Sequence, residues 1–207
     1  LKSIPIDLVK SKTIEAISLN NNEISKVPSD IFHKTPNLKC LNLAENEILF
    51  KYFQLEHDHL KKLILDYQLS NSLHNIDITE INIPSLKTLD LSQNQIGFIH
   101  EQMFKNIPFL LSSLKILNLQ GNQINNIDKM AFLKFTKLEF LDLSKNKLQL
   151  LPLGWHDNLL KLKYLNLELN FFVNIQDMKL NKLINLRNRL VLQNTKYKTS
   201  SGLLFSN

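Results

Sequence analysis

The sequence predicts an α/β-type solenoid, a curved stack of short strand-and-turn units with a parallel sheet on its concave side and irregular or 3-10 structure on its convex side. Two observations predict it. A frame with Leu or Ile at its first, fourth, sixth and eleventh places and Asn at its ninth recurs along the chain. The copies begin at residues 14, 38, 60, 86, 114, 138 and 162, which gives a period of about 24 residues.

Each place in the frame has a physical role. Side chains alternate along a strand, so the fourth and sixth residues point into the stack, and the residues between them point outward. Six copies are nearly complete. The third is degenerate, with Gln68 at the Asn place and Ser70 at a Leu place. An eighth copy at Leu190-Val191-Leu192 is out of phase by one residue.

The amide at the ninth place can both donate and accept hydrogen bonds, so we expect it to satisfy backbone groups that the turn would otherwise bury unpaired. The residues of this predicted asparagine ladder are Asn22, Asn46, Asn94, Asn122, Asn146 and Asn170. Phe32, Phe104, Phe132 and Leu180 share one later offset, which predicts a column of mostly aromatic side chains on the convex side of the core.

Composition restricts the class of protein. The chain has 207 residues, 43% of them hydrophobic, and a formal net charge of +6, which indicates a globular chain without a disordered bias. It contains no apolar run long enough to span a bilayer. Cys40 is the one cysteine, so no internal disulfide framework is expected. We find no phosphate-binding loop, nucleophile elbow or carboxylate pair, and therefore expect neither an enzyme nor a cofactor.

The repeat resembles the leucine-rich-repeat family, and the segment from Ile24 to Phe32 is similar to its typical 24-residue subtype, as in Toll-like receptors and insect immune repeat proteins. The resemblance implies a leucine-rich-repeat horseshoe. The opening residues resemble the end of an N-terminal cap and lack a signal peptide, so we expect a mature or excised piece of a longer protein. We predict a cap segment at 1–13, about seven repeats at 14–185, and a degenerate last repeat with a tail at 186–207.

The outward positions of the concave face are free of core duty and are the predicted binding surface. Lysines at one offset in four successive repeats, Lys39, Lys61, Lys87 and Lys115, predict a ladder of ammonium groups that repel one another and can attract an anionic partner. The competing interpretation is a solvated face. Phe140 and Tyr164 form the second feature, a pair of neighbouring outward aromatics typical of protein contacts. The predicted partner-binding residues are Lys39, Lys61, Tyr67, Lys87, Lys115, Phe140, Lys145, Lys163 and Tyr164.

Two further segments have more than one interpretation. His57-Asp58-His59 has metal-ligand residue types, but no third ligand is placed by the sequence, so we expect a solvated loop without metal. The apolar connection at residues 107–113 is either a partner contact or local packing.

These features favour a non-enzymatic module that binds a protein ligand or co-receptor, such as the ectodomain of an innate-immune or adhesion receptor at the cell surface or outside the cell. The absence of Asn-x-Ser/Thr sequons instead favours an intracellular or bacterial-effector repeat protein that docks on host proteins. The net charge and the lysines favour a third class, polyanion or nucleic-acid binding.

Overall fold

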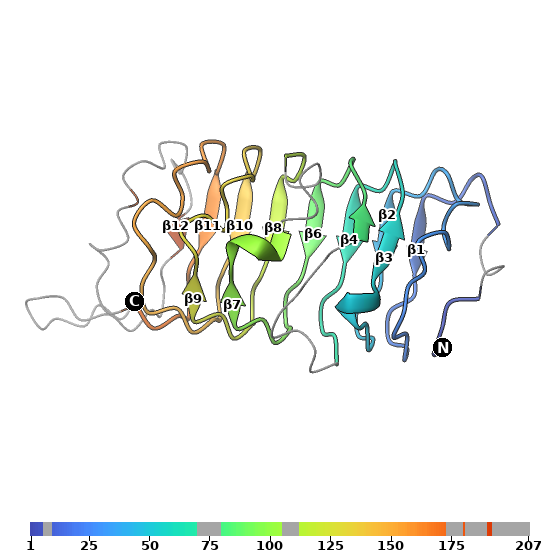
Figure 1. The fold of residues 1–207 in the computed structure, drawn as a ribbon, viewed down its shortest axis with the longest axis horizontal. Coiled ribbons are helices and arrows are strands. Elements are labelled where there is room, and N and C mark those ends of the chain that lie inside the picture. The colour runs from blue at the N-terminus through green and yellow to red at the C-terminus, as the bar shows by residue number, and fades with distance from the viewer. Residues whose placement is uncertain (6–9, 70–79, 105–111, 173–179, 181–189, 192–207) are drawn as a thin grey trace, which may run out of the picture.

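Eight short parallel strands form one continuous sheet, in the same order as along the chain. The computed structural model describes residues 1–5, 10–69, 80–104, 112–172, 180 and 190–191. Figure 1 shows the strands side by side along the long axis of the molecule. They are β1 (Ala16–Ser18), β2 (Cys40–Asn42), β4 (Lys62–Ile64), β6 (Thr88–Asp90), β8 (Ile116–Asn118), β10 (Phe140–Asp142), β11 (Tyr164–Asn166) and β12 (Leu190–Val191). The predicted solenoid with its parallel sheet is confirmed.

The register of the sheet follows the repeat frame. Leu41 lies opposite Leu63, and Leu63 lies opposite Leu89, so the degenerate third copy is a regular member of the sheet. The eighth strand also joins it, since Leu190 pairs with Leu165. Leu190 lies 25 residues after its partner Leu165, whereas Leu165 lies 24 residues after its own partner Leu141. The phase shift seen in the sequence is therefore one extra residue in the preceding connection.

The opposite side of the repeats is irregular. Two small parallel pairs lie there, β3 (Gln54–Glu56) with β5 (Glu80–Asn82), and β7 (Phe98–Ile99) with β9 (Asn126–Ile127). The helical elements are 3-10 turns, η1 (Phe50–Tyr52) and η3 (Glu101–Phe104). In the part of the chain that the structure describes, no α-helix is present, so the non-sheet side matches the 3-10 form of the prediction.

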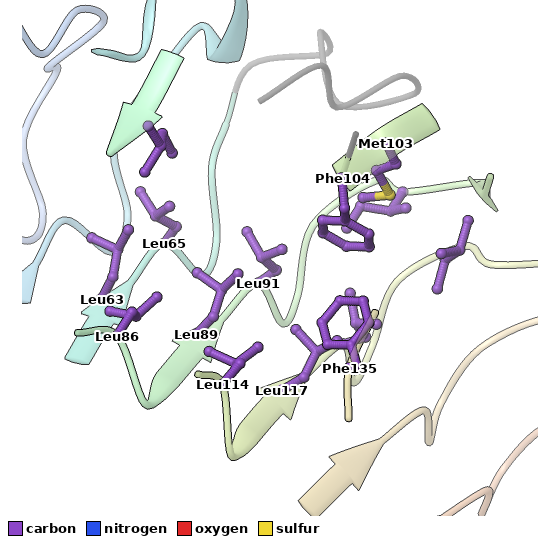
Figure 2. Packing of buried hydrophobic residues seen from close by; sticks show 14 of the residues in the cluster. Leu63, Leu65, Leu86, Leu89, Leu91, Met103, Phe104, Leu114, Leu117 and Phe135 are labelled. Atoms are coloured by element: carbon purple, nitrogen blue, oxygen red, sulfur yellow. The ribbon is translucent and has the colours of Figure 1, made fainter. Parts of the chain in front are cut away.

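The leucines between the sheet and this irregular side form the core. Leu63, Leu117, Leu141 and Leu165, at the fourth place of the frame, are fully buried. Figure 2 shows leucines of successive strands packed in rows, with Met103, Phe104 and Phe135 closing the space beyond them. Full burial of such a side chain stabilises the fold by about 1.5–3 kcal/mol. Because each repeat covers the leucines of the next, the core runs along the stack.

The asparagine ladder connects neighbouring repeats. The Oδ1 of Asn122 accepts the Ile96 N–H at 3.1 Å, and its Nδ2 donates to the carbonyls of Leu91 and Leu119 at 3.0 and 2.9 Å. Asn46, Asn146 and Asn170 repeat this pattern. Each of these four asparagines thus satisfies backbone groups of two repeats, whereas Asn22 bonds to the carbonyls of Leu19 and Asn20 in its own repeat and to the N-terminal amine of Leu1.

Gln68 takes the ladder position in the third repeat. Its Oε1 accepts the Ile48 N–H at 3.1 Å and its Nε2 donates to the Leu43 carbonyl at 2.9 Å. The Gln68 side chain is one methylene longer than that of Asn. The backbone N–H of Gln68 donates to Asn94 Oδ1, the ladder residue of the next repeat. A glutamine therefore keeps the ladder continuous where the frame is degenerate.

The aromatic column differs in detail from the prediction. Phe104 and Phe132 do not follow one another directly, because Phe135 lies between them with ring centroids at 5.2 and 5.6 Å. Trp155 extends the series from Phe132 at 5.8 Å. All three contacts are edge-to-face, the preferred geometry for aromatic rings. Phe32 is buried as expected, and Leu180 is partly buried against the same core.

The expectation of a solvated loop at His57-Asp58-His59 is wrong for its first residue. His57 is only 6% exposed, and its Nε2 lies 3.0 Å from the Thr35 carbonyl of the preceding repeat. Its Nδ1 accepts the His59 N–H at 3.3 Å, so Nε2 is the donor to Thr35. His57 is a structural link between repeats. The tail at 192–207 and most of the connection at 107–113 lie outside the described residues.

Candidate binding surface

The outward side chains of the large sheet form one continuous face, which we call the sheet face. Backbone hydrogen bonds align corresponding residues of successive strands, which lie about 4.8 Å apart. The third place of the frame contributes one row across it, made of Ala16, Cys40, Lys62, Thr88, Ile116, Phe140 and Tyr164. This row is mixed over the first four strands and apolar over β8, β10 and β11.

Phe140 and Tyr164 are directly paired, as the sequence predicts. Register places Phe140 opposite Tyr164 on one side and opposite Ile116 on the other. The two rings lie parallel, with centroids 4.2 Å apart and planes within 1°. Both rings are partly exposed, and Ile116 is 38% exposed. We call Ile116, Phe140 and Tyr164 the apolar stack.

A charged bridge borders the apolar stack. Glu139 accepts hydrogen bonds from Lys115 Nζ at 2.7 Å and from Lys163 Nζ at 2.5 Å. These three residues precede Phe140, Ile116 and Tyr164 along the chain, so they form the adjacent row. The hydrogen bonds from Lys115 and Lys163 lower the pKa of Glu139 to about 2. The carboxylate is therefore ionised throughout the physiological range.

This pairing changes the interpretation of the predicted lysine ladder. Its row contains glutamates at both ends, Glu15 beside Lys39 and Glu139 between Lys115 and Lys163, and each of these lysines is in an ion pair. Lys87 Nζ lies 3.5 Å from the Ser113 carbonyl. Lys61 makes no ion pair with the described residues. The four lysines do not simply repel one another, because Lys39 and Lys115, at the two ends of the ladder, are paired with glutamates. The offset that Glu15 and Glu139 share with the lysines was the sequence signal for this pairing.

Acidic groups lie close to the middle of the same face. The pKa of Asp66 is raised, first by burial of its carboxyl and then by the negative charge of Asp90. Its Oδ1 is buried and has no hydrogen-bond partner in the described structure. Asp142 and Asp90 each accept from a serine two residues later, Ser144 and Ser92. Asp66 and Asp90, which belong to the repeats of Lys61 and Lys87, oppose the positive field of these two lysines.

Tyr67 and Lys145 lie beyond the strands, in the turns that follow β4 and β10. Both have left-handed backbone conformations, with φ of 51° and 55°. The residue before the ladder residue is left-handed in each of the seven described repeats, at Asn21, Glu45, Tyr67, Gln93, Gly121, Lys145 and Leu169. These two predicted binding residues thus lie at the edge of the sheet. They are not part of the third-place row that contains the apolar stack.

The described residues offer little reactive chemistry. They contain no group of three or more His, Cys, Asp or Glu side chains placed to hold a metal ion. Cys40 is unpaired and half-buried in the third-place row. Among the helices in the described part of the chain, none is long and apolar enough to cross a bilayer.

Comparison with known proteins places the repeat in a family. Two family models, both described as leucine-rich repeats, match residues 82–97 and 112–172. The chain is 31% identical to human Toll-like receptor 8 over 194 residues, covering 84% of this chain and 18% of that protein. It is 32% identical to mouse podocan over 167 residues, covering 79% of this chain and 26% of that protein. The chain therefore spans about a quarter or less of these relatives.

Solved structures share the fold. The TLR13–ssRNA13 complex superposes with a TM-score of 0.65 at 22% identity, covering 89% of this chain and 29% of that one. The Toll–Spätzle complex of Drosophila gives 0.68 at 17% identity, covering 94% and 26%. At such identities the likeness concerns the fold alone. The repeat frame, the register of its leucines, its asparagine ladder and the matched models agree, and the chain belongs to the leucine-rich-repeat family.

Proposed function

We propose that this chain is a non-enzymatic recognition module that binds a protein partner through its sheet face, with the apolar stack at the centre of the contact. The stack supports the proposal because it is a partly exposed apolar surface on three adjacent strands. The residues that contribute most of the binding energy of a protein contact are often aromatic and lie at its centre, surrounded by polar groups.

The charged bridge supplies the polar border. Lys115, Glu139 and Lys163 hold one another in place, so binding does not require the ordering of three loose side chains. Because the carboxylate is already paired with two ammonium groups, the bridge presents a small net positive charge beside the apolar stack. A partner with apolar side chains and an acidic rim fits this surface.

The names of the structural neighbours include both a protein ligand and an RNA. The surface favours the protein class. Binding to a phosphate backbone relies on lysines and arginines that are free to replace counterions, whereas Lys39, Lys115 and Lys163 are already paired with glutamates. Polyanion binding through Lys61 and Lys87 is the second candidate. Its support is the net charge of +6.

The relative that is a receptor supports a place at the cell surface or outside the cell for the whole protein. An intracellular or bacterial-effector protein is the alternative. The identity of the molecule bound at the apolar stack separates the two, because each compartment supplies different partners.

Site-specific photo-crosslinking tests the proposal while the partner is still unidentified. Tyr164 in the full-length protein is replaced by a photoreactive phenylalanine analogue, and the protein is irradiated in the cells that make it. The expected result is a discrete protein adduct that is lost when Phe140→Ala is added. The matched control places the same analogue at Tyr52, a 46% exposed tyrosine on the non-sheet side in η1.

The adduct itself identifies the ligand class. Sensitivity to protease supports the protein proposal, whereas sensitivity to nuclease supports the polyanion alternative and rejects ours. Equal adducts from Tyr52 and Tyr164, or none from Tyr164, reject binding through the apolar stack.

A further inference from the structure

A strip of exposed and partly exposed residues follows the turns at one edge of the sheet. In each repeat the two residues that flank the ladder residue share this edge. Over five successive repeats they are Glu45 and Glu47, Tyr67 and Leu69, Gln93 and Gln95, Gly121 and Gln123, and Lys145 and Lys147. Corresponding turns are hydrogen-bonded to one another, for example Gly121 N–H to the Ser144 carbonyl and Glu45 N–H to the Asp66 carbonyl. We call these ten residues the edge strip.

The charges of the edge strip are separated along its length. Its first repeat is acidic, with Glu45 and Glu47 exposed, and its last is basic, with Lys145 and Lys147 exposed. Within the described ranges none of these four side chains is in an ion pair, although Lys147 Nζ lies 3.3 Å from Gln123 Oε1. The three repeats between them carry no charge at these positions.

The apolar residues of the strip lie next to its acidic end. Tyr67 is 51% exposed and Leu69 is 68% exposed, high values for large apolar side chains. A hollow of about 800 Å³ is lined by Glu45, Glu47, Tyr67 and Leu69 together with Leu1 and with residues 21–23 of the preceding repeat. Acidic walls beside an aromatic ring and an aliphatic side chain are complementary to a long cationic side chain such as that of lysine.

The edge strips of two copies are complementary in charge when they run in opposite directions. The sheet order β2-β4-β6-β8-β10 places the acidic repeat two strands before β6 and the basic repeat two strands after it. A two-fold axis beside the turn that follows β6 therefore brings Glu45 and Glu47 of one copy opposite Lys145 and Lys147 of the other. Symmetry makes the same contact a second time, as in any isologous pair.

The same axis matches the uncharged positions. Tyr67 and Leu69 of one copy face Gly121 and Gln123 of the other. Gly121 has no side chain, and the Gln93 side-chain amide lies over it, within 2.6 Å of the position that a Cβ would take. The exposed Tyr67 ring thus faces an uncharged surface without a protruding side chain at Gly121. Nowhere along the edge strip does a charge lie opposite a like charge.

We propose that two copies of this chain associate antiparallel through the edge strip, with the two-fold axis beside β6. The strip is two residues wide in each repeat, so the contact area is small and the dimer forms and dissociates with concentration. The contact lies in the turns and does not use the apolar stack. It is independent of the proposed function.

Sedimentation velocity on the 207-residue chain over a range of concentrations tests the dimer. We expect self-association at about 50 mM salt that weakens at about 0.5 M salt, because exposed charges are screened. The double substitution Glu45→Lys with Glu47→Lys, and separately Lys145→Glu with Lys147→Glu, should each raise the dissociation constant at least about tenfold.

Mixing the two charge-reversed variants distinguishes this pairing from a general effect of charge. Each variant has like charges at both ends of its strip, so it repels its own copies, whereas an equimolar mixture restores both contacts and should dimerise. Lys129→Glu with Lys134→Glu, exposed lysines outside the edge strip, changes the net charge by the same amount as Lys145→Glu with Lys147→Glu and should leave dimerisation unchanged. A wild-type chain that stays monomeric, or a dimer that survives charge reversal, overturns the proposal, as does a mixture that remains monomeric.

Discussion

At the scale of single residues, one amide side chain stands between each pair of neighbouring repeats. Asn122 accepts one backbone N–H and donates to two carbonyls, and it is only 5% exposed. If this side chain is removed, the Ile96 N–H and the carbonyl groups lose their partner at a buried position. The cost is set by these unsatisfied groups more than by the hydrogen bonds themselves.

We therefore expect Asn122→Ala to lower the free energy of unfolding by about 1–3 kcal/mol. Urea unfolding followed by circular dichroism measures it. Asn125→Ala, at an exposed position three residues further on, is the matched control and should change stability by less than about 0.5 kcal/mol. Equal effects of the two substitutions would show that the ladder contributes nothing specific.

His57 is the residue at which sequence reasoning failed. A polar His-Asp-His segment indicates a loop in most proteins, and only the fold brings the Thr35 carbonyl within 3.0 Å of the ring. Because Thr35 and His57 come from different repeats, neither residue alone predicts the contact. We expect His57→Ala to destabilise the chain by about 1–3 kcal/mol, since a buried carbonyl loses its donor. The neighbouring exposed His59→Ala should be close to neutral in the same unfolding experiment.

Glu139 gives stability a defined dependence on pH. Its pKa is lowered to about 2 in the folded chain, so folding favours the ionised form. The contribution is present above the ordinary pKa of a glutamate and is lost as pH falls from about 4.5 toward 2. Partial exposure and solvent screening limit it to about 1 kcal/mol or less. The stability difference between wild type and Glu139→Gln should therefore be measurable at pH 7 and vanish near pH 2. A difference independent of pH would contradict the pairing.

At the scale of strands, the period of two separates core from surface. The sequence alone predicts which leucines are buried, which asparagines form the ladder, and that Phe140 and Tyr164 are neighbours, because all three follow from one frame. The shared offset places Glu139 between Lys115 and Lys163, but the sequence does not predict that both lysines donate to it, since that depends on rotamers across three strands. Nor does it predict Phe135 between Phe104 and Phe132, because the irregular side lacks a fixed register.

The stacked rings are a further consequence at this scale. The ring centroids of Phe140 and Tyr164 lie 4.2 Å apart with parallel planes, and the spacing of about 4.8 Å between adjacent strands brings the two rings together. A double-mutant cycle of Phe140→Ala and Tyr164→Ala on the free energy of unfolding should give a coupling energy of about 1 kcal/mol or less. A coupling of several kcal/mol would show that the rings are part of the core.

At the scale of the whole molecule, the solenoid offers two separate surfaces. The sheet face carries the apolar stack and the charged bridge, whereas the edge strip carries opposite charges at its two ends. Both consist of positions that the repeat leaves free, and both arise from side chains aligned at a constant offset through many repeats. The sheet face and the edge strip differ in chemistry because they use different places of the repeat. The sheet face uses outward residues of the strands, whereas the edge strip uses the residues on either side of the ladder residue.

We propose that Leu141 and Phe140, adjacent residues of one strand, have opposite roles, Leu141 in the core and Phe140 in binding. The free energies of unfolding of Leu141→Ala and Phe140→Ala, measured side by side in urea, test it most directly. The expected result is a loss of about 2–5 kcal/mol for Leu141→Ala, which opens a cavity in the core. Phe140→Ala should cost less than about 1.5 kcal/mol, because its ring is partly exposed. If Phe140→Ala costs as much as Leu141→Ala, the ring is a core residue and the apolar stack is not a binding surface.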